Sequence, residues 1–395
     1  MISEKMKKMV AGNSIIRTMF EEGLNLKKIY GAENVFDFSL GNPNVPAPES
    51  VKKAAIALLN QEAPTTLHGY MPNQGFPKVR AKIAASLNKR FGVNFSEKNI
   101  LMTVGAAGGL NTALKTLLNP GEEVLTFAPF FGEYRNYVAN FGGELIVVPP
   151  NPPSFQPNLE AFEKALNKKT KAVIINSPNN PTGVVYSEET IKKLASILKA
   201  KEKEFGATIY LISDEPYREL VYGDTFVPYL PNYYSDTIVG YSYSKSLSLP
   251  GERIGYLAVP SELDDFETVM PALTIANRIL GFVNAPSLFQ LVISECLEEK
   301  TDLDYYARNG KTLYEGLKAA GFSCVKPEGA FYLFMKAPEE NDAAFAEKAK
   351  KYNILLVPGS FFGCAGYVRL AYCVAYETIT NSLPKFKELA KEYGL

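Results

Sequence analysis

Histidine and cysteine are scarce in this chain of 395 residues. There is one histidine, His68, and none of the four cysteines forms a C-x-x-C pair with another. A zinc site built from cysteine and histidine therefore lacks ligands, and no metal is expected. Four cysteines without such a pattern are typical of reduced thiols in a cytoplasmic protein.

An excess of charge of one sign is also missing, because 42 Lys and Arg residues balance 42 Asp and Glu residues. The chain thus has no overall field that would attract nucleic acid or an anionic membrane. No stretch approaches the roughly 20 apolar residues that are needed to span a bilayer. The N-terminal segment MISEKMKKMVAG is basic, but no apolar run comes after it, so we do not expect a secretory signal.

The signatures of two other protein classes are absent as well. A nicotinamide or flavin enzyme is expected to carry G-x-G-x-x-G after its first strand, and the glycines between 105 and 109 do not match that spacing. A transcription regulator would need a basic helix-turn-helix domain, for which the chain has no additional length. Neither class is favoured.

What the chain does contain is a regular alternation of strand-like and helix-like segments. Hydrophobic residues make up 46% of it and charged residues 21%, which suffices for a large core, and its length favours two domains. Apolar residues recur at helical spacing over 110–118 and 191–198, between short apolar runs. This alternation predicts an α/β fold with a mostly parallel sheet and helices on both faces. The expected strands are 123–127, 145–148, 172–175, 208–212, 237–240 and 254–259.

Polar motifs lie just after several of these strands. In chain order they are Asn176-x-Pro-x-Asn180-Pro-Thr-Gly, Asp214-x-x-Tyr217, Ser242-Tyr-Ser-Lys245 with Pro-Gly-Glu-Arg253 shortly after it, and Arg369. In order and spacing they resemble the class I/II aminotransferases, which are fold-type-I pyridoxal-phosphate enzymes of the aspartate aminotransferase type, and the similarity covers nearly the whole chain. The resemblance implies a large cofactor-binding domain over 45–285 with a seven-stranded sheet. It also implies a smaller α+β domain formed by 1–44 with 286–395, and a homodimer with shared active sites.

Lys245 and Asp214 are the expected catalytic residues. A pyridoxal-phosphate enzyme needs a lysine amine that binds the cofactor aldehyde as a Schiff base, and Lys245 comes after a predicted strand, where open α/β sheets bind ligands. Once released from the cofactor, this amine can act as general acid and base. Asp214 ends an apolar strand, where a buried carboxylate needs a cationic partner. The protonated ring nitrogen of pyridoxal 5'-phosphate would be that partner.

The resemblance assigns further residues to the cofactor ring and to the dimer. Asn180 and Tyr217 would donate hydrogen bonds to the phenolic oxygen of the cofactor, which gives Tyr217 a catalytic role. Phe131 would stack on the ring. Tyr70 matches a family tyrosine that reaches the cofactor phosphate from the partner subunit.

The phosphate is expected at a glycine-rich helix start. Gly105, Ala106 and Ala107 would offer backbone N–H groups to an anion there. The family often has a hydroxyl or amide side chain after the first glycine, and the two alanines lack one. Ser242 and Arg253 are therefore expected to carry more of the phosphate binding, Arg253 as a forked, charge-assisted donor.

Fewer residues can be assigned to substrate binding than to cofactor binding. Arg369 matches the family arginine that binds the α-carboxylate of an amino acid bidentately. Gly41 matches a loop that passes close over the substrate, where a side chain would collide, and Asn180 is also expected to contact the substrate. Arg278 lies near the place where dicarboxylate-specific relatives bind the distal carboxylate, so aspartate or glutamate is one hypothesis for the donor. The many aromatic residues leave an aromatic pocket open as an alternative.

The expected reaction is transfer of an amino group between an L-amino acid and a 2-oxo acid by a ping-pong mechanism. A β-lyase or decarboxylase that acts on an amino acid is the alternative, because the same Lys, Asp and Arg serve those reactions too. These reactions differ in which bond at the substrate Cα is broken and in the steps after proton loss. The motifs do not decide between them.

Overall fold

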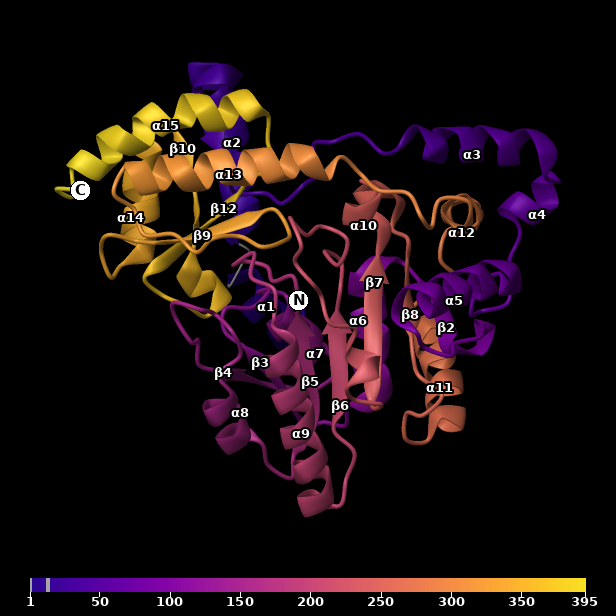
Figure 1. Cartoon of the computed structure of the whole chain (residues 1–395). Helices are drawn as coiled ribbons and strands as arrows, with labels where there is room; N and C mark the ends of the chain where they lie inside the picture. The colour runs from indigo at the N-terminus through magenta and orange to yellow at the C-terminus, as the bar shows by residue number, and fades with distance from the viewer. Residues whose placement is uncertain (1, 12–14) are drawn as a thin grey trace. The chain divides into compact units, whose positions relative to one another are not determined.

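The computed structural model describes residues 2–11 and 15–395, and within this part seven strands form one sheet. One of them, β8, is antiparallel to both of its neighbours, and the other six run in the same direction. Figure 1 shows β5, β6 and β7 side by side. The predicted α/β fold with a mostly parallel sheet is thus confirmed. In order across the sheet the strands are β2 (Ile100–Thr103), β8 (Gly255–Ala258), β7 (Thr237–Ser242), β6 (Tyr210–Asp214), β5 (Thr170–Asn176), β3 (Glu123–Phe127) and β4 (Glu144–Val148).

The six predicted strands are all present, and their ends lie within about two residues of the predicted ones. The strand that the sequence did not reveal is β2, whose four residues are fully buried. A short apolar run of this kind has no alternation, so its sequence does not distinguish it from a buried piece of helix.

The described residues divide into two compact units, and the whole seven-stranded sheet belongs to the larger one. The larger unit consists of Pro43–Tyr305 and Glu328–Ala330. The smaller unit consists of the described residues up to Asn42, Tyr306–Pro327 and Phe331–Leu395.

The observed division differs from the predicted boundary at residue 286. Sequence analysis assigns α12 (Ser287–Ser294) to the smaller domain, whereas the structure has it in the larger unit. The reason is its packing, because Leu291 and Ile293 belong to one hydrophobic cluster with Tyr241 and Tyr256 of the sheet. The later segments of the smaller unit begin only at Tyr306, inside a long helix.

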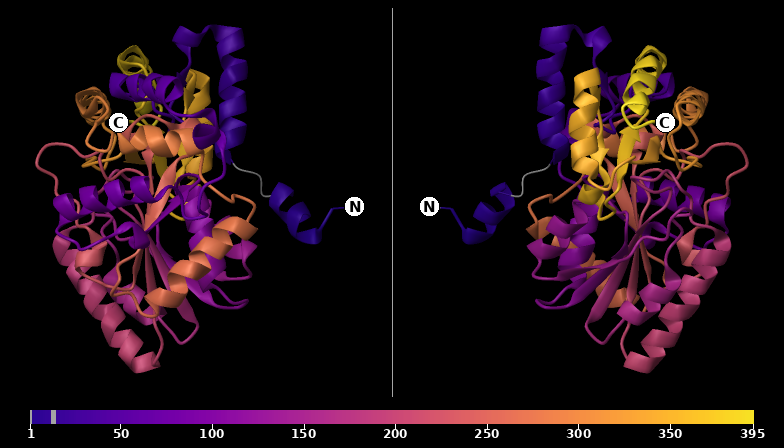
Figure 2. Two further views of the ribbon diagram at one scale, coloured as in Figure 1. Left: turned by 90° about the vertical axis from the view of Figure 1, so that its right-hand side faces the viewer. Right: turned by 90° about the vertical axis from the view of Figure 1, so that its left-hand side faces the viewer.

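Helices cover both faces of the sheet, as the alternating pattern predicted. One face packs against α6 (Gly105–Leu117), α7 (Tyr134–Asn140) and α11 (Phe266–Ile279). The other packs against α8 (Leu159–Ala165) and α9 (Glu188–Phe205) over one half, and α5 (Pro77–Phe91) and α12 over the other. Figure 2 shows α9 and α11 on opposite sides of the sheet. The remaining helices of the larger unit are α3 (Glu49–Gln61), α4 (Pro64–His68) and the single turn α10 (Tyr243–Ser246).

Side-chain alternation along β6 decides what its last residue faces. Tyr210 and Ile212 pack in the cluster under α6, α7 and α11, whereas Leu211 packs under α9 on the other face. Asp214 therefore points to the α6, α7 and α11 face. Its partner in register on β5 is Asn176, so two polar residues end neighbouring strands at one edge.

The smaller unit brings segments from both ends of the chain together. β1 (Phe36–Asp37) pairs in parallel with β10 (Ile354–Leu355). The ring of Phe38 lies 6.1 Å from that of Phe386. A second, antiparallel sheet has the order β11 (Val357–Pro358), β12 (Tyr367–Ala371), β9 (Tyr332–Lys336). The helices are α1 (Glu4–Ala11), α2 (Ile15–Tyr30), α14 (Asp342–Ala349), α15 (Tyr376–Lys391) and most of α13 (Leu303–Ala319).

A substitution at Gly255 in β8 tests how closely the backbone packs in the large sheet. A Cβ there would overlap the carbonyl oxygen of Tyr241 and lie 3.1 Å from the Cα of Gly105. We expect Gly255→Ala to lower the free energy of unfolding by about 1–3 kcal/mol, because backbone cannot move aside as a flexible side chain would. The change is read as a lower melting temperature.

Gly251 provides the matched control for this substitution. It lies four residues earlier, and a Cβ there meets nothing within 4 Å. Gly251→Ala should stay within about 0.5 kcal/mol of wild type. Equal stability of the two variants would contradict the close packing at Gly255.

Candidate active site

Three neighbouring strands end at the same edge of the large sheet and carry most of the predicted residues there. β5 ends at Asn176, β6 at Asp214 and β7 at Ser242. Lys245 comes immediately afterwards in α10, whose N-cap is Ser242. The Ser242 hydroxyl accepts a hydrogen bond from the backbone N–H of Ser244 at 3.2 Å. The sheet edge therefore brings Lys245 and Asp214 together from segments about 30 residues apart.

Asp214 is a buried carboxylate with one of its two oxygens unsatisfied. The residue is 5% exposed. Its Oδ2 accepts a hydrogen bond of 2.5 Å from the Tyr134 hydroxyl. Its Oδ1 is buried and has no hydrogen-bond partner in the structure. Burial raises the pKa of Asp214 to about 7, although the hydrogen bond from Tyr134 acts in the opposite direction. An N–H cation beside Oδ1 would satisfy it, so the site fits the protonated ring nitrogen of pyridoxal phosphate.

Tyr134 is a site residue that the sequence did not single out. It lies at the start of α7, is fully buried, and approaches Phe131 edge-on with ring centroids 5.7 Å apart. The one side chain thus holds Asp214 through its hydroxyl and the predicted stacking residue Phe131 through its ring. A buried tyrosine needs a hydrogen-bond partner for its hydroxyl, and this need was the one indication that Tyr134 could belong to a polar site. The identity of that partner could not be read from the sequence.

Asn176 joins two of the predicted residues through its amide. Its Nδ2 donates to the backbone carbonyl of Asp214 at 2.8 Å, and its Oδ1 accepts from the backbone N–H of Asn180 at 2.8 Å. The side chain of Asn180 in turn donates to the hydroxyl of Tyr217 at 3.5 Å. Asn180 and Tyr217 were predicted to act on the same cofactor oxygen, and the structure places their polar groups together. The sequence motif contained Asn176 but gave no indication of its role.

The start of α6 has the features of an anion site. Gly105 has φ +74°, and a Cβ there would lie 2.8 Å from a guanidinium nitrogen of Arg253. The first N–H groups of a helix have no partner within it, which leaves those of Ala106 and Ala107 available for an anion. The predicted residues Gly105, Ala106, Ala107 and Arg253 therefore lie in one place.

Ser244 links the serine and the arginine of this anion site. The Ser242 hydroxyl donates to the Ser244 hydroxyl at 2.7 Å, and Arg253 Nη1 lies 3.5 Å from the same Ser244 oxygen. Sequence analysis named Ser242 and Arg253 but not Ser244, although it lies inside the lysine motif. Ser244 thus adds a second hydroxyl beside Ser242 and Arg253.

The smaller unit holds Arg369 and Gly41. Arg369 lies in the central strand β12 and is 2% exposed. Its guanidinium stacks between Tyr332, at 4.7 Å, and Phe362, at 4.9 Å, and Nη2 donates to the carbonyl of Ser39 at 2.5 Å. A Cβ on Gly41 would overlap the hydroxyl of Tyr332. Within this chain, the group that excludes a side chain at position 41 is therefore Tyr332, and the predicted approach of Gly41 to the substrate stays a prediction.

Tyr70 and Arg278 stand apart from this cluster. Tyr70 is 92% exposed, and Arg278 lies exposed in the last turn of α11. Among the described residues, no hydrogen bond joins either of them to the strand-end cluster. The segment after Tyr70 contacts the loop after α11, because the side chain of Asn284 donates to the carbonyl of Pro72 at 3.1 Å.

No group of three or more His, Cys, Asp or Glu side chains among the described residues is arranged to hold a metal ion. No helix in this part of the chain combines the length and the apolar character that crossing a membrane requires.

The raised pKa of Asp214 leads to a test on the cofactor-free protein. The unfolded chain ionises this carboxyl near its usual pKa of 3.8, whereas the folded chain does so only at about 7. Between these values the folded state alone holds the proton, so this group makes folding less favourable as the pH rises. Asp214→Asn removes that penalty. Its stability advantage over wild type should grow by about 3 kcal/mol between pH 5 and pH 8.

Melting temperatures of both proteins across this pH range measure the effect. Other groups titrate alike in the two proteins, so the difference isolates Asp214. An advantage that does not change with pH would show that the carboxylate is not destabilised and needs no cationic partner.

Comparison with known proteins gives the family. The profile of aminotransferases class I and II matches residues 33–385. A probable aspartate/prephenate aminotransferase of Aquifex aeolicus is 33% identical over 385 residues, which cover 91% of this chain and 92% of that protein.

Solved structures agree with the sequence relatives. An aminotransferase from Eubacterium rectale superposes with a TM-score of 0.98 at 46% identity, covering 100% of this chain and 99% of that one. The aspartate aminotransferase of Thermus thermophilus solved with maleate superposes with a TM-score of 0.88 at 27% identity, covering 98% and 99%. None of these three relatives is named a lyase or a decarboxylase. Enzymes of this family use pyridoxal phosphate and act on amino acids and 2-oxo acids. The chain belongs to the class I and II aminotransferase family, and it is an aminotransferase.

Proposed function

We propose that this aminotransferase carries pyridoxal 5'-phosphate on the Nζ amine of Lys245 and transfers an amino group between an L-amino acid and a 2-oxo acid in two half-reactions. The observation that carries the proposal is the unsatisfied Oδ1 of Asp214, buried at the sheet edge where Lys245 comes after β7. A carboxylate buried without a cation is costly, and the ring nitrogen of the cofactor would be that cation. The anion site at the start of α6 would hold the phosphate.

Each residue then has a role that its own chemistry explains. When bound, the cofactor supplies an electron sink for negative charge that develops at the substrate Cα. Asp214 keeps a proton on the ring nitrogen, and the Lys245 amine moves the proton at the substrate Cα. Asn180 and Tyr217 donate hydrogen bonds to the phenolic oxygen. Phe131, positioned by Tyr134, packs on the ring.

The phosphate would be held by two kinds of donor. Backbone N–H groups of Gly105, Ala106 and Ala107 point out of the start of α6, where the helix dipole favours negative charge. The Ser242 hydroxyl and the Arg253 guanidinium add side-chain donors, and the arginine supplies positive charge.

The experiment that tests the covalent link is borohydride reduction with subsequent peptide mapping. Wild-type protein supplied with pyridoxal phosphate should turn yellow and retain a reduced adduct at Lys245. Lys245→Ala should lose both the adduct and amino transfer. Lys115→Ala serves as control, because Lys115 is exposed in the last turn of α6, and it should behave as wild type. An adduct elsewhere, or none in the folded wild type, rejects the proposal.

For the substrate, we propose an amino acid that Arg369 binds through the α-carboxylate, with Asn180 as a further contact and Gly41 in the adjoining loop. The planar guanidinium matches a carboxylate bidentately, and the rings of Tyr332 and Phe362 fix its plane. A dicarboxylic donor such as aspartate or glutamate is supported by two of the relatives. The Aquifex protein is named for aspartate, and the Thermus enzyme was solved with maleate, which is a dicarboxylate.

Arg278 is the proposed partner of the distal carboxylate, and Arg278→Leu tests it. Loss of one charge partner should lower kcat/KM for aspartate by about 30-fold or more, because the distal carboxylate would be left without its cation. The kcat/KM for alanine is the internal control and should change little. An unchanged preference for aspartate over alanine would exclude Arg278 from substrate recognition.

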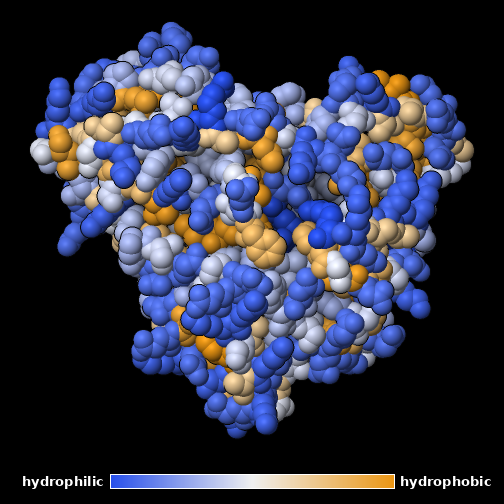
Figure 3. All heavy atoms as spheres, viewed as in Figure 1, coloured by the Kyte–Doolittle hydropathy of each residue, from blue (hydrophilic) through white to orange (hydrophobic). Residues whose placement is uncertain are grey.

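We also propose a homodimer in which Tyr70 reaches the phosphate of the partner subunit. Tyr70 is almost fully exposed in the single chain, which is unusual for a large aromatic side chain. Apolar side chains gather on the surface over α3 in Figure 3, where Ile56 and Leu59 are about half exposed. On α11, Ile275 and Ile279 are exposed to a similar degree. Apolar surface of this kind supports an interface.

A further inference from the structure

A buried ion pair lies directly behind Asp214, on the opposite face of the sheet. Glu215 is the next residue after Asp214 in the chain and therefore points the other way. Arg218 binds its carboxylate with two nitrogens: Nε donates to Oε2, and Nη2 donates to Oε1 at 2.7 Å. The side chains of Arg218 and Glu215 are 4% and 1% exposed, so solvent does not screen them.

The surroundings of Arg218 hold its guanidinium in one place. The guanidinium carbon of Arg218 lies 5.1 Å from the centre of the Phe91 ring and 5.2 Å from that of the Tyr229 ring. Nη1 donates to the carbonyl of Val227 at 3.1 Å, and Nη2 donates to that of Pro228 at 2.9 Å. Although burial disfavours the cation, the Glu215 carboxylate raises the pKa of Arg218, so Arg218 keeps its positive charge.

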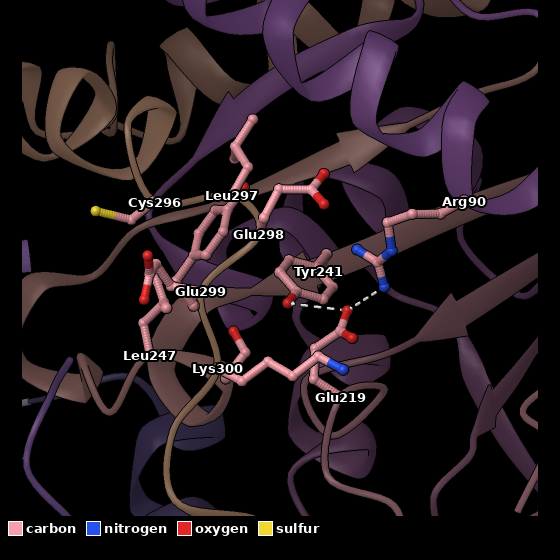
Figure 4. A pocket seen from close by; sticks show the side chains of 11 residues that line it. Arg90, Glu219, Tyr241, Leu247, Cys296, Leu297, Glu298, Glu299 and Lys300 are labelled. Carbon is pink, nitrogen blue, oxygen red and sulfur yellow. Dashed lines mark hydrogen bonds and ion pairs between the residues drawn. The ribbon is translucent and has the colours of Figure 1, made fainter. Parts of the chain in front are cut away.

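A second pair of the same kind lies nearby but reaches solvent. Arg90 Nη2 lies 2.5 Å from Glu219 Oε1, and the Tyr241 hydroxyl donates to the same oxygen at 3.4 Å. Figure 4 shows both contacts in the wall of a pocket of about 280 Å³, with the side chain of Lys300 extending toward Glu219. The side chains of Arg90 and Glu219 are 28% and 18% exposed. The partly exposed pair of Arg90 and Glu219 can therefore be compared with the buried pair of Glu215 and Arg218, which differs from it in exposure to solvent.

Of this buried pair, Glu215 is the member that acts on Asp214 through charge. Burial is the main cause of the raised pKa of Asp214, the hydrogen bond from Tyr134 lowers that pKa, and the Glu215 carboxylate raises it further. The other ionisable groups near Asp214 include Tyr134 and Tyr137 on α7, with Tyr217 beside Tyr134 and Arg253 near Tyr137. Lys245 comes after β7 at the same sheet edge. Those near Glu215 include Arg218, Tyr229 on the following loop and Tyr256 on β8, and the Glu219 carboxylate also acts on Arg218. Of the groups near Glu215, Arg218 is the cation that pairs with its carboxylate.

We propose that Arg218 is a positioning residue for Asp214: by neutralising Glu215 it keeps Asp214 ionised and able to hold the cationic ring nitrogen of the cofactor. Two adjacent buried carboxylates cannot both stay charged without a counter-charge, and the unpaired one would take the proton. This inference rests on the proposed function. It adds that the electrostatic state of the ring nitrogen is set from the far side of the sheet.

The test measures binding of pyridoxamine 5'-phosphate by calorimetry between pH 5.5 and 8.5. This probe has the cofactor ring and phosphate but no aldehyde, so it reports on Asp214 and the anion site without the link to Lys245. In wild type, binding should weaken below about pH 7 as Asp214 takes a proton. Arg218→Met should move that midpoint up by about one pH unit, which is about tenfold weaker binding below it.

Two further variants separate charge from packing. The double variant Glu215→Gln with Arg218→Met removes both charges and should return the midpoint to the wild-type value. Arg90→Met breaks the solvent-exposed pair and should leave the midpoint unchanged, because solvent screens its charge. If Arg218→Met does not fold, Glu215→Gln alone remains informative, since removing the anion should move the midpoint down.

The outcomes against the proposal are distinct. An unshifted midpoint in Arg218→Met, or in Glu215→Gln, overturns it. A midpoint that stays raised in the double variant also overturns it, because Arg218 would then act through its contacts with Phe91 and Tyr229. If wild type does not bind the probe at all, the proposed function fails together with this inference.

Discussion

The free-energy cost of burying one carboxylate explains much of the larger unit. Asp214 lies at the end of an apolar strand with one oxygen held by Tyr134 and the other without a partner. A folded chain tolerates such a group when a cation completes it. In the function proposed above, the ring nitrogen of the cofactor would be that cation, and the free protein would hold a site that is unfavourable until it is filled. The proposed function would then exchange stability at this position for affinity.

The position of β8 explains how distant segments meet at the anion site. Gly255 of β8 is in register with Thr103 of β2 on one side and with Ser242 of β7 on the other. The antiparallel strand therefore brings the turn before α6 and the turn after β7 to the same edge. Arg253 precedes Gly255 by two residues and reaches Gly105 from there. One reversed strand thus collects glycine, serine and arginine from three parts of the sequence.

The sequence revealed the residues whose role depends on their place on a strand. Lys245 and Asp214 were predicted from motifs that resemble those of a known family, and their positions at the ends of predicted strands supported this, because the ends of parallel strands meet at one edge. Contacts between side chains from different elements were not accessible in this way. Nothing in the spacing tells that the hydroxyl of Tyr134 reaches a carboxylate 80 residues away, or that Ser244 lies between a serine and an arginine. The strand Ile100–Thr103 was missed for a related reason, since four apolar residues have no periodicity to read.

The contact between Gly41 and Tyr332 in the smaller unit has a consequence for how this enzyme can diversify. The ring of Tyr332 occupies the space beside Gly41 and also forms one side of the stack around Arg369. Any residue larger than glycine at position 41 would push Tyr332 aside and loosen the arginine. Mutational libraries that vary position 41 alone would therefore be depleted of active members. Useful diversity at this loop requires paired changes at 41 and 332, and the two positions should co-vary among homologous sequences.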